Sequence, residues 1–151
     1  MKRKYKNIFS LLLLCALVAI SSLTAFADVS SDWKESTVYG YTYEYYSRGE
    51  VVWNIPSQRY NLRAMGTVRN AAMKNVPAGY MGVQARLYTS NGTLKLSSSY
   101  VYNSTAIINE LAYTSETSSS GYFYSHTQVK LYNGDGYNTY NAYKSPNIAA
   151  P

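Results

Sequence analysis

The sequence predicts an all-β protein, an antiparallel β-sandwich or a small β-barrel of about eight strands. Three observations support this prediction. Apolar and polar residues alternate with a period of two in several segments after residue 36, as in strands that bury one face. Turn-forming residues such as Asn-Gly, Pro and Gly separate these segments at short intervals. No segment after residue 36 has a convincing amphipathic helix pattern.

The first 27 residues are interpreted as a signal peptide. A basic start (Lys2–Lys6) precedes a 13-residue apolar core, Ile8–Ile20, and Ala25-Phe26-Ala27 fits an A-x-A cleavage site. An uncleaved membrane anchor is the alternative, although the apolar run is short for the roughly 20 residues that span a bilayer. We therefore expect a secreted protein that is cleaved after Ala27.

Removing this leader changes the bulk composition. The expected mature chain has 124 residues, the size of one domain, and its net charge falls from +6 to +2. It has no cysteine, because Cys15 lies in the leader, so its core must be stable without disulfides. The low net charge does not indicate nucleic-acid binding through a basic patch. We expect a polar N-terminal segment at 28–36, one β-domain at 37–146 and a flexible tail at 147–151.

The first half of the domain is rich in alternating segments. Thr37–Tyr46 predicts one strand, and Ser47-Arg48-Gly49 predicts a turn. Glu50–Ile55 predicts a short strand that Pro56 stops. Arg59–Asn70 alternates again.

Tyr80–Tyr102 gives the clearest prediction, a β-hairpin closed by Asn91-Gly92. This turn pairs Leu87 with Leu96 and Met81 with Tyr102, and it separates an apolar face from a polar one. The residues predicted to be most securely in the core are Met81, Val83, Leu87, Leu94 and Leu96.

The last third contains two hairpin strands and one ambiguous segment. Thr105–Thr114 is short and has no helix caps, so a strand is favoured over a helix. Gly121–Tyr132 alternates, and Asn133–Gly136 predicts the turn to a returning strand at Tyr137–Tyr143. The predicted core face of Gly121–Tyr132 carries Phe123, Thr127, Val129 and Leu131.

The residues needed for common enzymes are missing. His126 is the single histidine, and it lies on the polar face of its predicted strand, without a nucleophile motif around it. A zinc site would need several His or Cys ligands, which the expected mature chain does not have. A calcium site at Asn133–Gly136 would have just one carboxylate. We therefore predict a non-enzymatic protein with no cofactor and no metal site.

Tyrosine is the unusual feature of the composition. All of the 18 tyrosines except Tyr5 lie after residue 27. Tyrosine suits both half-buried sheet faces and binding surfaces, so the ladder in Thr37–Tyr46 is either core or a surface for sugar rings. The candidate binding residues are Tyr39, Tyr41, Tyr43, Tyr45, Trp53, Tyr122, Tyr124, His126 and Tyr132.

Two segments resemble a group of small exported proteins of Gram-positive bacteria. These are Asn75–Tyr88 (NVPAGYMGVQARLY) and Tyr132–Tyr140 (YNGDGYNTY). The resemblance covers roughly residues 66–146. It implies export and an all-β domain, and it assigns no catalytic or binding residues.

Three functions are compatible with these observations. The first is a secreted or surface-associated domain that binds cell-wall polymer or another extracellular carbohydrate through exposed tyrosines. The second is a bacteriocin-like or membrane-active protein, since amphipathic strands suit a bilayer. The third is a self-assembling extracellular protein, because tyrosine-rich edge strands with few charges invite strand addition.

Overall fold

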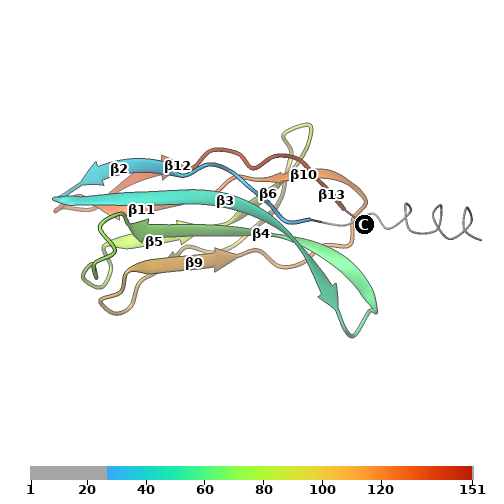
Figure 1. Ribbon diagram of the computed structural model, residues 1–151, viewed down its shortest axis with the longest axis horizontal. Helices are drawn as coiled ribbons and strands as arrows, with labels where there is room; N and C mark the ends of the chain where they lie inside the picture. The colour runs from blue at the N-terminus through green and yellow to red at the C-terminus, as the bar shows by residue number, and fades with distance from the viewer. Residues whose placement is uncertain (1–26, 151) are drawn as a thin grey trace, which may run out of the picture.

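The computed structural model describes residues 27–150, which form a two-layer antiparallel β-sandwich (Figure 1). The predicted signal peptide lies outside these residues except for Ala27. Among the residues described, no helix is long and apolar enough to cross a membrane. The first layer is a five-stranded sheet in which β3 and β4 are central, β9 lies beside β4, and β1 and β2 both pair with β3. Its strands are β1 (Val29–Ser30), β2 (Lys34–Val38), β3 (Tyr41–Asn54), β4 (Arg59–Asn70) and β9 (Asn109–Tyr113).

The second layer consists of two four-stranded sheets in series, ordered β12-β11-β5-β8 and β13-β10-β6-β7. Only Ala85 separates β5 from β6, and only His126-Thr127 separates β10 from β11, so both sheets belong to one layer. In residues 27–150 no sheet closes on itself, so the sandwich prediction is confirmed over the barrel. The strands are β5 (Met81–Gln84), β6 (Arg86–Thr89), β7 (Leu94–Ser97), β8 (Val101–Tyr102), β10 (Gly121–Ser125), β11 (Gln128–Tyr132), β12 (Tyr137–Asn141) and β13 (Ile148–Ala150).

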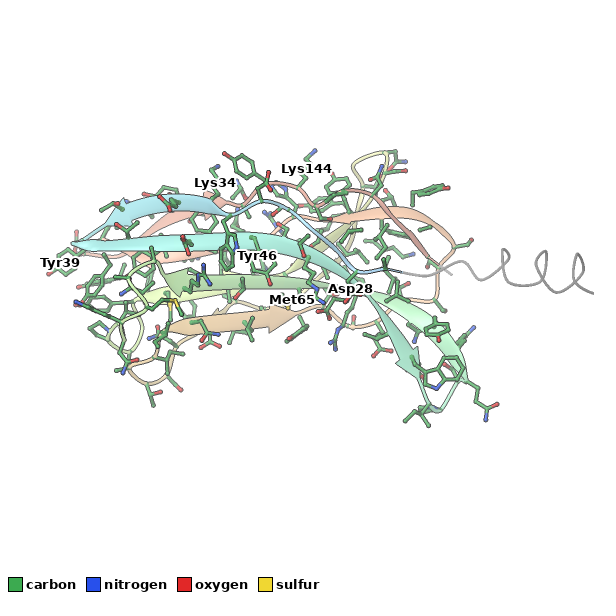
Figure 2. All side chains as sticks on the ribbon, viewed as in Figure 1. Asp28, Lys34, Tyr39, Tyr46, Met65 and Lys144 are labelled. Atoms are coloured by element: carbon green, nitrogen blue, oxygen red, sulfur yellow. The ribbon has the colours of Figure 1, made fainter. Side chains whose placement is uncertain are left out.

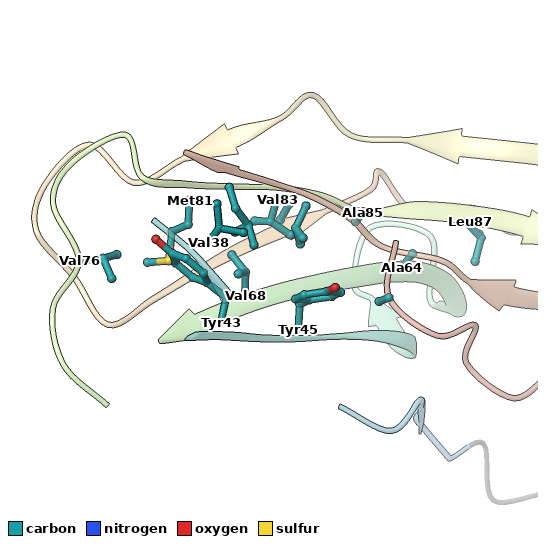
Figure 3. Close-up of a cluster of buried hydrophobic side chains, with 14 of the residues drawn as sticks. Val38, Tyr43, Tyr45, Ala64, Val68, Val76, Met81, Val83, Ala85 and Leu87 are labelled. Carbon is teal, nitrogen blue, oxygen red and sulfur yellow. The ribbon is translucent and has the colours of Figure 1, made fainter. Parts of the chain in front are cut away.

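The core lies between the two layers (Figure 3). Every second residue of each central strand points into it, as the period of a strand requires. The predicted core faces are confirmed at eight positions, each of which is almost completely buried. These positions are Met81, Val83, Ala85, Leu87, Phe123, Thr127, Val129 and Leu131.

The predicted strand at Thr37–Tyr46 is two strands joined by a tight turn. Tyr39 and Gly40 both have positive φ, at 50° and 80°, which is the geometry of a type I′ hairpin turn. Tyr39 therefore lies at the tip of a hairpin (Figure 2), and the tyrosine ladder begins only at Tyr41. Tyr43 and Tyr45 are fully buried, so the core interpretation of this ladder holds for them.

The predicted turn at Ser47-Arg48-Gly49 is wrong. These residues lie within the 14-residue strand β3, which pairs with β4 along its whole length. Ser47 and Gly49 are small because the second layer comes close to the strand here: a Cβ on Gly49 would lie 3.1 Å from Ile148 Cγ2. The small residues that suggest a turn here are instead needed because the two layers lie close together. The actual turn follows Asn54, whose Oδ1 accepts a 3.0 Å hydrogen bond from the Ser57 backbone N–H.

The hairpin predicted at Tyr80–Tyr102 has the expected central register and two departures from it. Leu87 pairs with Leu96 as predicted, but a bulge after Leu87 pairs Tyr88 with Leu94. Because Tyr88 faces outward, Leu94 does too, and it is 50% exposed; its prediction as a core residue is wrong. The second departure is a one-residue shift in register at the far end of the hairpin, where Tyr102 pairs with Gly82 instead of Met81.

The remaining boundaries also differ in places. The ambiguous segment Thr105–Thr114 contains strand β9, which favours the strand interpretation. The predicted N-terminal segment at 28–36 contains β1 and the start of β2. Residues 147–151 are predicted as a flexible tail, whereas Ile148–Ala150 form β13, which pairs with β10 and buries Ile148.

Tyr43 and Tyr45 provide a matched test of the core. The Tyr43 hydroxyl is buried without a hydrogen-bond partner in the described chain, whereas the Tyr45 hydroxyl lies 2.8 Å from Ser36 Oγ. We expect Tyr45→Phe to lower the free energy of unfolding by about 1 kcal/mol, and Tyr43→Phe to leave it unchanged or slightly raised. Urea denaturation at pH 7 measures both variants. An equal loss in the two variants would contradict the assigned hydrogen bonding.

The effect of Tyr43→Phe on stability is expected to depend on pH. Burial, followed by the neighbouring Tyr41 and Tyr80 hydroxyls, raises the pKa of Tyr43 from 10.0 to about 12. The folded state therefore holds this proton more tightly, so the contribution of Tyr43 is present below pH 10 and is lost as pH rises towards 12. The stability advantage of Tyr43→Phe over the native chain should consequently grow between pH 10 and 12.

Candidate binding surface

Seven tyrosines form a continuous chain of ring contacts over one end and the outer face of the second layer. Successive ring centroids lie 4.8 to 6.0 Å apart from Tyr100 to Tyr102, Tyr137, Tyr132 and Tyr80, and the last of these also contacts Tyr39 and Tyr41. Such distances are typical of favourable aromatic pairs. We name this set the tyrosine cluster; its members are Tyr39, Tyr41, Tyr80, Tyr100, Tyr102, Tyr132 and Tyr137.

Strand alternation and register place three members of the cluster, Tyr102, Tyr132 and Tyr137, on the outer face of the second layer. Val129 and Leu131 of β11 are buried, so Lys130 and Tyr132 point outward. Register pairs Tyr132 with Tyr137, and it aligns Lys130 with Gly82, which pairs with Tyr102. These three tyrosines and Lys130 therefore share one surface.

Two glycines let tyrosine rings lie directly on the backbone. A Cβ on Gly82 would lie 2.6 Å from the Tyr102 ring, and a Cβ on Gly134 would lie 2.7 Å from the Tyr39 ring. Any residue with a Cβ atom at either position would clash with the ring, so both positions require glycine. Gly134 also has a φ of 100° in the turn between β11 and β12, a conformation that favours glycine.

Hydrogen bonds fix three rings of the cluster. The Tyr132 hydroxyl donates to the Gly134 carbonyl and the Tyr137 hydroxyl to the Gly79 carbonyl, both at 2.8 Å, while the Tyr100 hydroxyl donates to Gln128 Oε1. Burial raises the pKa of Tyr100 and Tyr137. Nearby Arg86 partly offsets the rise at Tyr100, and neighbouring tyrosines add to the rise at both residues. The hydroxyls of Tyr100 and Tyr137 therefore stay protonated, and the hydrogen bonds hold all three rings in place.

Amide side chains lie beside the rings. Gln84, Gln128 and Asn141 are aligned across β5, β11 and β12. Gln128 Nε2 donates to Asn141 Oδ1 at 3.1 Å, and Arg86 Nη2 donates to the same oxygen at 2.8 Å. The surface thus combines aromatic rings with donors and acceptors suited to hydroxyl groups.

A second aromatic group lies on β6 and β10 in the same layer. Tyr88 and Tyr124 stack at 5.3 Å with an interplanar angle of 6°, and Lys144 Nζ lies 4.8 Å from the Tyr124 ring. His126 lies 6.0 Å from Tyr88. Burial lowers the pKa of His126, and the nearby Arg86, Lys144 and Lys34 lower it further, so this imidazole is neutral at pH 7.

The end of the β3–β4 hairpin is a separate exposed surface, which extends beyond the body of the sandwich (Figure 1). The rings of Trp53 and Tyr60 contact each other at 4.9 Å, and Ile55 between them is 76% exposed. We name Trp53, Ile55 and Tyr60 the hairpin tip. Its base is held by Glu116, which accepts hydrogen bonds from Asn61 and Asn54 that lower its pKa.

The structure divides the nine predicted binding residues among five locations. Tyr39, Tyr41 and Tyr132 belong to the tyrosine cluster, and Trp53 belongs to the hairpin tip. Tyr43 and Tyr45 are core residues and offer no surface. Tyr124 is mostly buried beside half-buried His126, and Tyr122 is 62% exposed at the far end of β10.

Four members of the cluster were not predicted from the sequence: Tyr80, Tyr100, Tyr102 and Tyr137. The prediction assigned Tyr100 and Tyr102 to the core face, and the one-residue shift in pairing moves Tyr102 to the other face. Tyr137 carried a usable signal, because it and Tyr132 flank the predicted four-residue turn and must pair once that turn forms.

Neither known proteins nor a metal site assigns a role to this surface. The chain matches no protein-family model, and no curated protein matches it. The resemblance to small exported proteins therefore stays a prediction. Within residues 27–150, no three His, Cys, Asp or Glu side chains are grouped so that they could hold a metal ion.

Proposed function

We propose that this protein is a non-enzymatic, secreted carbohydrate-binding domain whose binding surface is the tyrosine cluster and its adjacent amides. The observation that carries the proposal is the row of outward-facing rings from Tyr100 through Tyr102 and Tyr137 to Tyr132. Tyrosine faces stack on the apolar faces of sugar rings, while amides hydrogen-bond sugar hydroxyls. Rings held by hydrogen bonds lose little conformational entropy on binding, so the surface is preorganised.

Tyr137→Ala tests this proposal. We expect affinity for a bound polysaccharide to fall about tenfold, equivalent to about 1.4 kcal/mol, since a stacked ring is lost. The measurement is retention of the purified protein on insoluble peptidoglycan and on a panel of insoluble polysaccharides. Tyr113→Ala is the matched control, because Tyr113 is 42% exposed on the first layer and Tyr137 is 43% exposed. Retention on none of the polymers would overturn the proposal.

A second candidate function, membrane binding, rests on the hairpin tip. Trp53 and Tyr60 are on the face of the hairpin that forms the core further along, and the second layer does not cover them. Residues 51–62 contain no carboxylate and one cation, Arg59. Tryptophan, tyrosine and a basic residue around an exposed isoleucine suit the interface of an anionic bilayer.

Trp53→Ser combined with Ile55→Ser tests the membrane candidate. We expect the native protein to sediment with anionic phospholipid vesicles and the double variant to lose at least about tenfold in partitioning, because each side chain contributes apolar area. Leu111→Ser with Tyr113→Ser, at exposed positions of β9, is the control. Absence of sedimentation by the native protein would rule out this function without affecting the carbohydrate proposal.

A further inference from the structure

Charged residues are distributed unequally between the two layers. The strands of the first layer contain Glu35, Glu44, Glu50 and Glu110, whereas those of the second layer contain no carboxylate. All four ion pairs found in the described residues join Arg48, Arg63 or Arg69 to acids of the first layer or to Asp28. The net charge of the whole chain conceals this separation.

Within residues 27–150, the cations beside the tyrosines form no ion pair with an acidic side chain. Lys130 Nζ lies 4.5 Å from the centre of the Tyr100 ring, Lys144 lies over Tyr124, and the Arg86 guanidinium lies 5.9 Å from the Tyr88 ring. Arg86 also donates hydrogen bonds, but its acceptors are uncharged: the His126 carbonyl and Asn141 Oδ1. Among residues 117–150 the one carboxylate is Asp135, and it lies in the turn beyond the end of β11.

These cations extend the tyrosine cluster into a track along β11 and β10. Lys130 lies beside the cluster, over the Tyr100 ring. His126 is four residues from Lys130, or about 13 Å along an extended chain, and its backbone N–H donates to the Arg86 carbonyl. Lys144 precedes Ser145, whose backbone N–H donates to the Ser125 carbonyl of β10. Lys144 therefore follows Arg86 along the track. Lys34 contributes a fourth positive charge, because its Nζ donates to the Asn141 carbonyl at 2.9 Å.

We propose that the ligand of this surface is an anionic glycan polymer, one that carries phosphate or carboxylate groups along its chain. The inference rests on the proposed carbohydrate-binding function and names its substrate class. Rings of the tyrosine cluster contact sugar faces, and Lys130, Arg86 and Lys144 contact successive anionic groups. A neutral glycan leaves these cations without partners, whereas an anionic one meets a complementary potential.

Two comparisons, one for each anionic group, test the inference. Cell walls before and after hydrofluoric acid removal of phosphate polymers test phosphate, and polygalacturonate against its fully methyl-esterified form tests carboxylate. At 150 mM NaCl we expect at least about fivefold stronger binding to one anionic member than to its neutral counterpart. The member that shows the difference identifies the anionic group.

A charge-matched pair of variants separates this track from general attraction. Lys130→Gln with Lys144→Gln is expected to weaken binding to the anionic polymer about fivefold. Arg59→Gln with Lys74→Gln, which changes the net charge equally at exposed sites off the track, is expected to leave binding unchanged.

The outcomes are distinct. Equal binding to anionic and neutral polymers overturns the inference and keeps the carbohydrate-binding proposal, whereas binding to neither overturns both. Equal weakening by the two double variants also overturns the inference, since the attraction is then not local. Tighter binding to single-stranded DNA than to every glycan overturns it as well, because stacked tyrosines with lysines also suit nucleic acid.

Discussion

Replacing Asn103 by alanine is expected to lower the free energy of unfolding by about 3 kcal/mol. This side chain is fully buried, and each of its polar hydrogens and its oxygen has a partner. Asn103 Oδ1 accepts from the Met81 N–H at 3.1 Å, and Nδ2 donates to the carbonyls of Pro77 and Thr105 at 2.8 and 3.0 Å. Alanine removes these partners from the Met81 N–H and the Thr105 carbonyl, while the Pro77 carbonyl keeps the Tyr80 N–H as a donor; a buried unpaired group costs about 1–3 kcal/mol.

Asn103→Asp sharpens this test. The aspartate carboxylate would face two carbonyl oxygens, so the folded state favours its protonated form and its pKa rises above the unfolded value of about 3.9. Stability is then retained at low pH and lost as pH rises, so the variant should be more destabilised at pH 7 than at pH 4. Urea denaturation at both pH values measures this, with exposed Asn109→Ala as the control. A loss below 1 kcal/mol for Asn103→Ala would contradict the role assigned to this side chain.

Gly66→Ala is expected to lower the free energy of unfolding by about 1–3 kcal/mol. Gly66 lies in the middle of β4, where a Cβ would be 2.6 Å from Thr127 Cγ2 and 3.1 Å from Val83 Cγ2. Thr127 cannot move aside freely. Its backbone N–H donates to Ser47 Oγ at 2.8 Å, and its carbonyl accepts from Ala142. The added methyl group therefore pushes the two layers apart.

A second substitution distinguishes a clash with Thr127 from a general effect of replacing glycine in a strand. Thr127→Ala removes both atoms nearest to the new methyl group, so it should recover part of the loss in the Gly66→Ala background, giving a favourable coupling energy. Gly136→Ala is the control, since no atom lies within 4 Å of its added Cβ and its φ is not in the left-handed region. Thermal or urea unfolding of the four variants gives the comparison. Additive losses from Gly66→Ala and Thr127→Ala would show that the two layers do not meet here as described.

The fold class and most inward-facing residues could be predicted because a half-buried strand imposes its own period on the sequence. Leu87 and Leu96 were paired correctly, since Asn91-Gly92 and the apolar pattern specify the same register. Leu94 was assigned to the wrong face because a one-residue bulge reverses every residue beyond it, and alternation alone gives no warning of a bulge.

Small residues caused a turn to be predicted where the strand is continuous. Ser47 and Gly49 are typical of a turn, but they are equally suited to a strand that another sheet approaches closely. Asn103 is of a residue type that is common in turns, whereas its side chain here pairs with the backbone of Met81, Pro77 and Thr105. Whether a polar residue ends a strand or supports a buried loop depends on partners distant in sequence, which local pattern does not contain.

The candidate surface was only partly predictable for the same reason. The excess of tyrosine was evident, and Tyr132 was correctly placed on an outer face. The grouping of Tyr132 with Tyr80 and Tyr102 needed the order of strands β11, β5 and β8, which no single segment reveals. The unpaired cations were hidden as well, because the net charge of +2 expected for residues 28–151 is nearly neutral and does not show that the strand carboxylates all lie in one layer.

The separation of acids from unpaired cations gives the molecule an electric dipole directed from the first layer towards the second. A dipole experiences a torque near a charged surface even when the net charge is small. Close to a polyanionic matrix, the molecule turns its tyrosine-bearing layer towards the matrix before contact, within about 8 Å at physiological ionic strength. The arrangement of charge therefore selects the orientation of encounter, so that fewer collisions occur with the paired, salt-bridged layer facing the matrix.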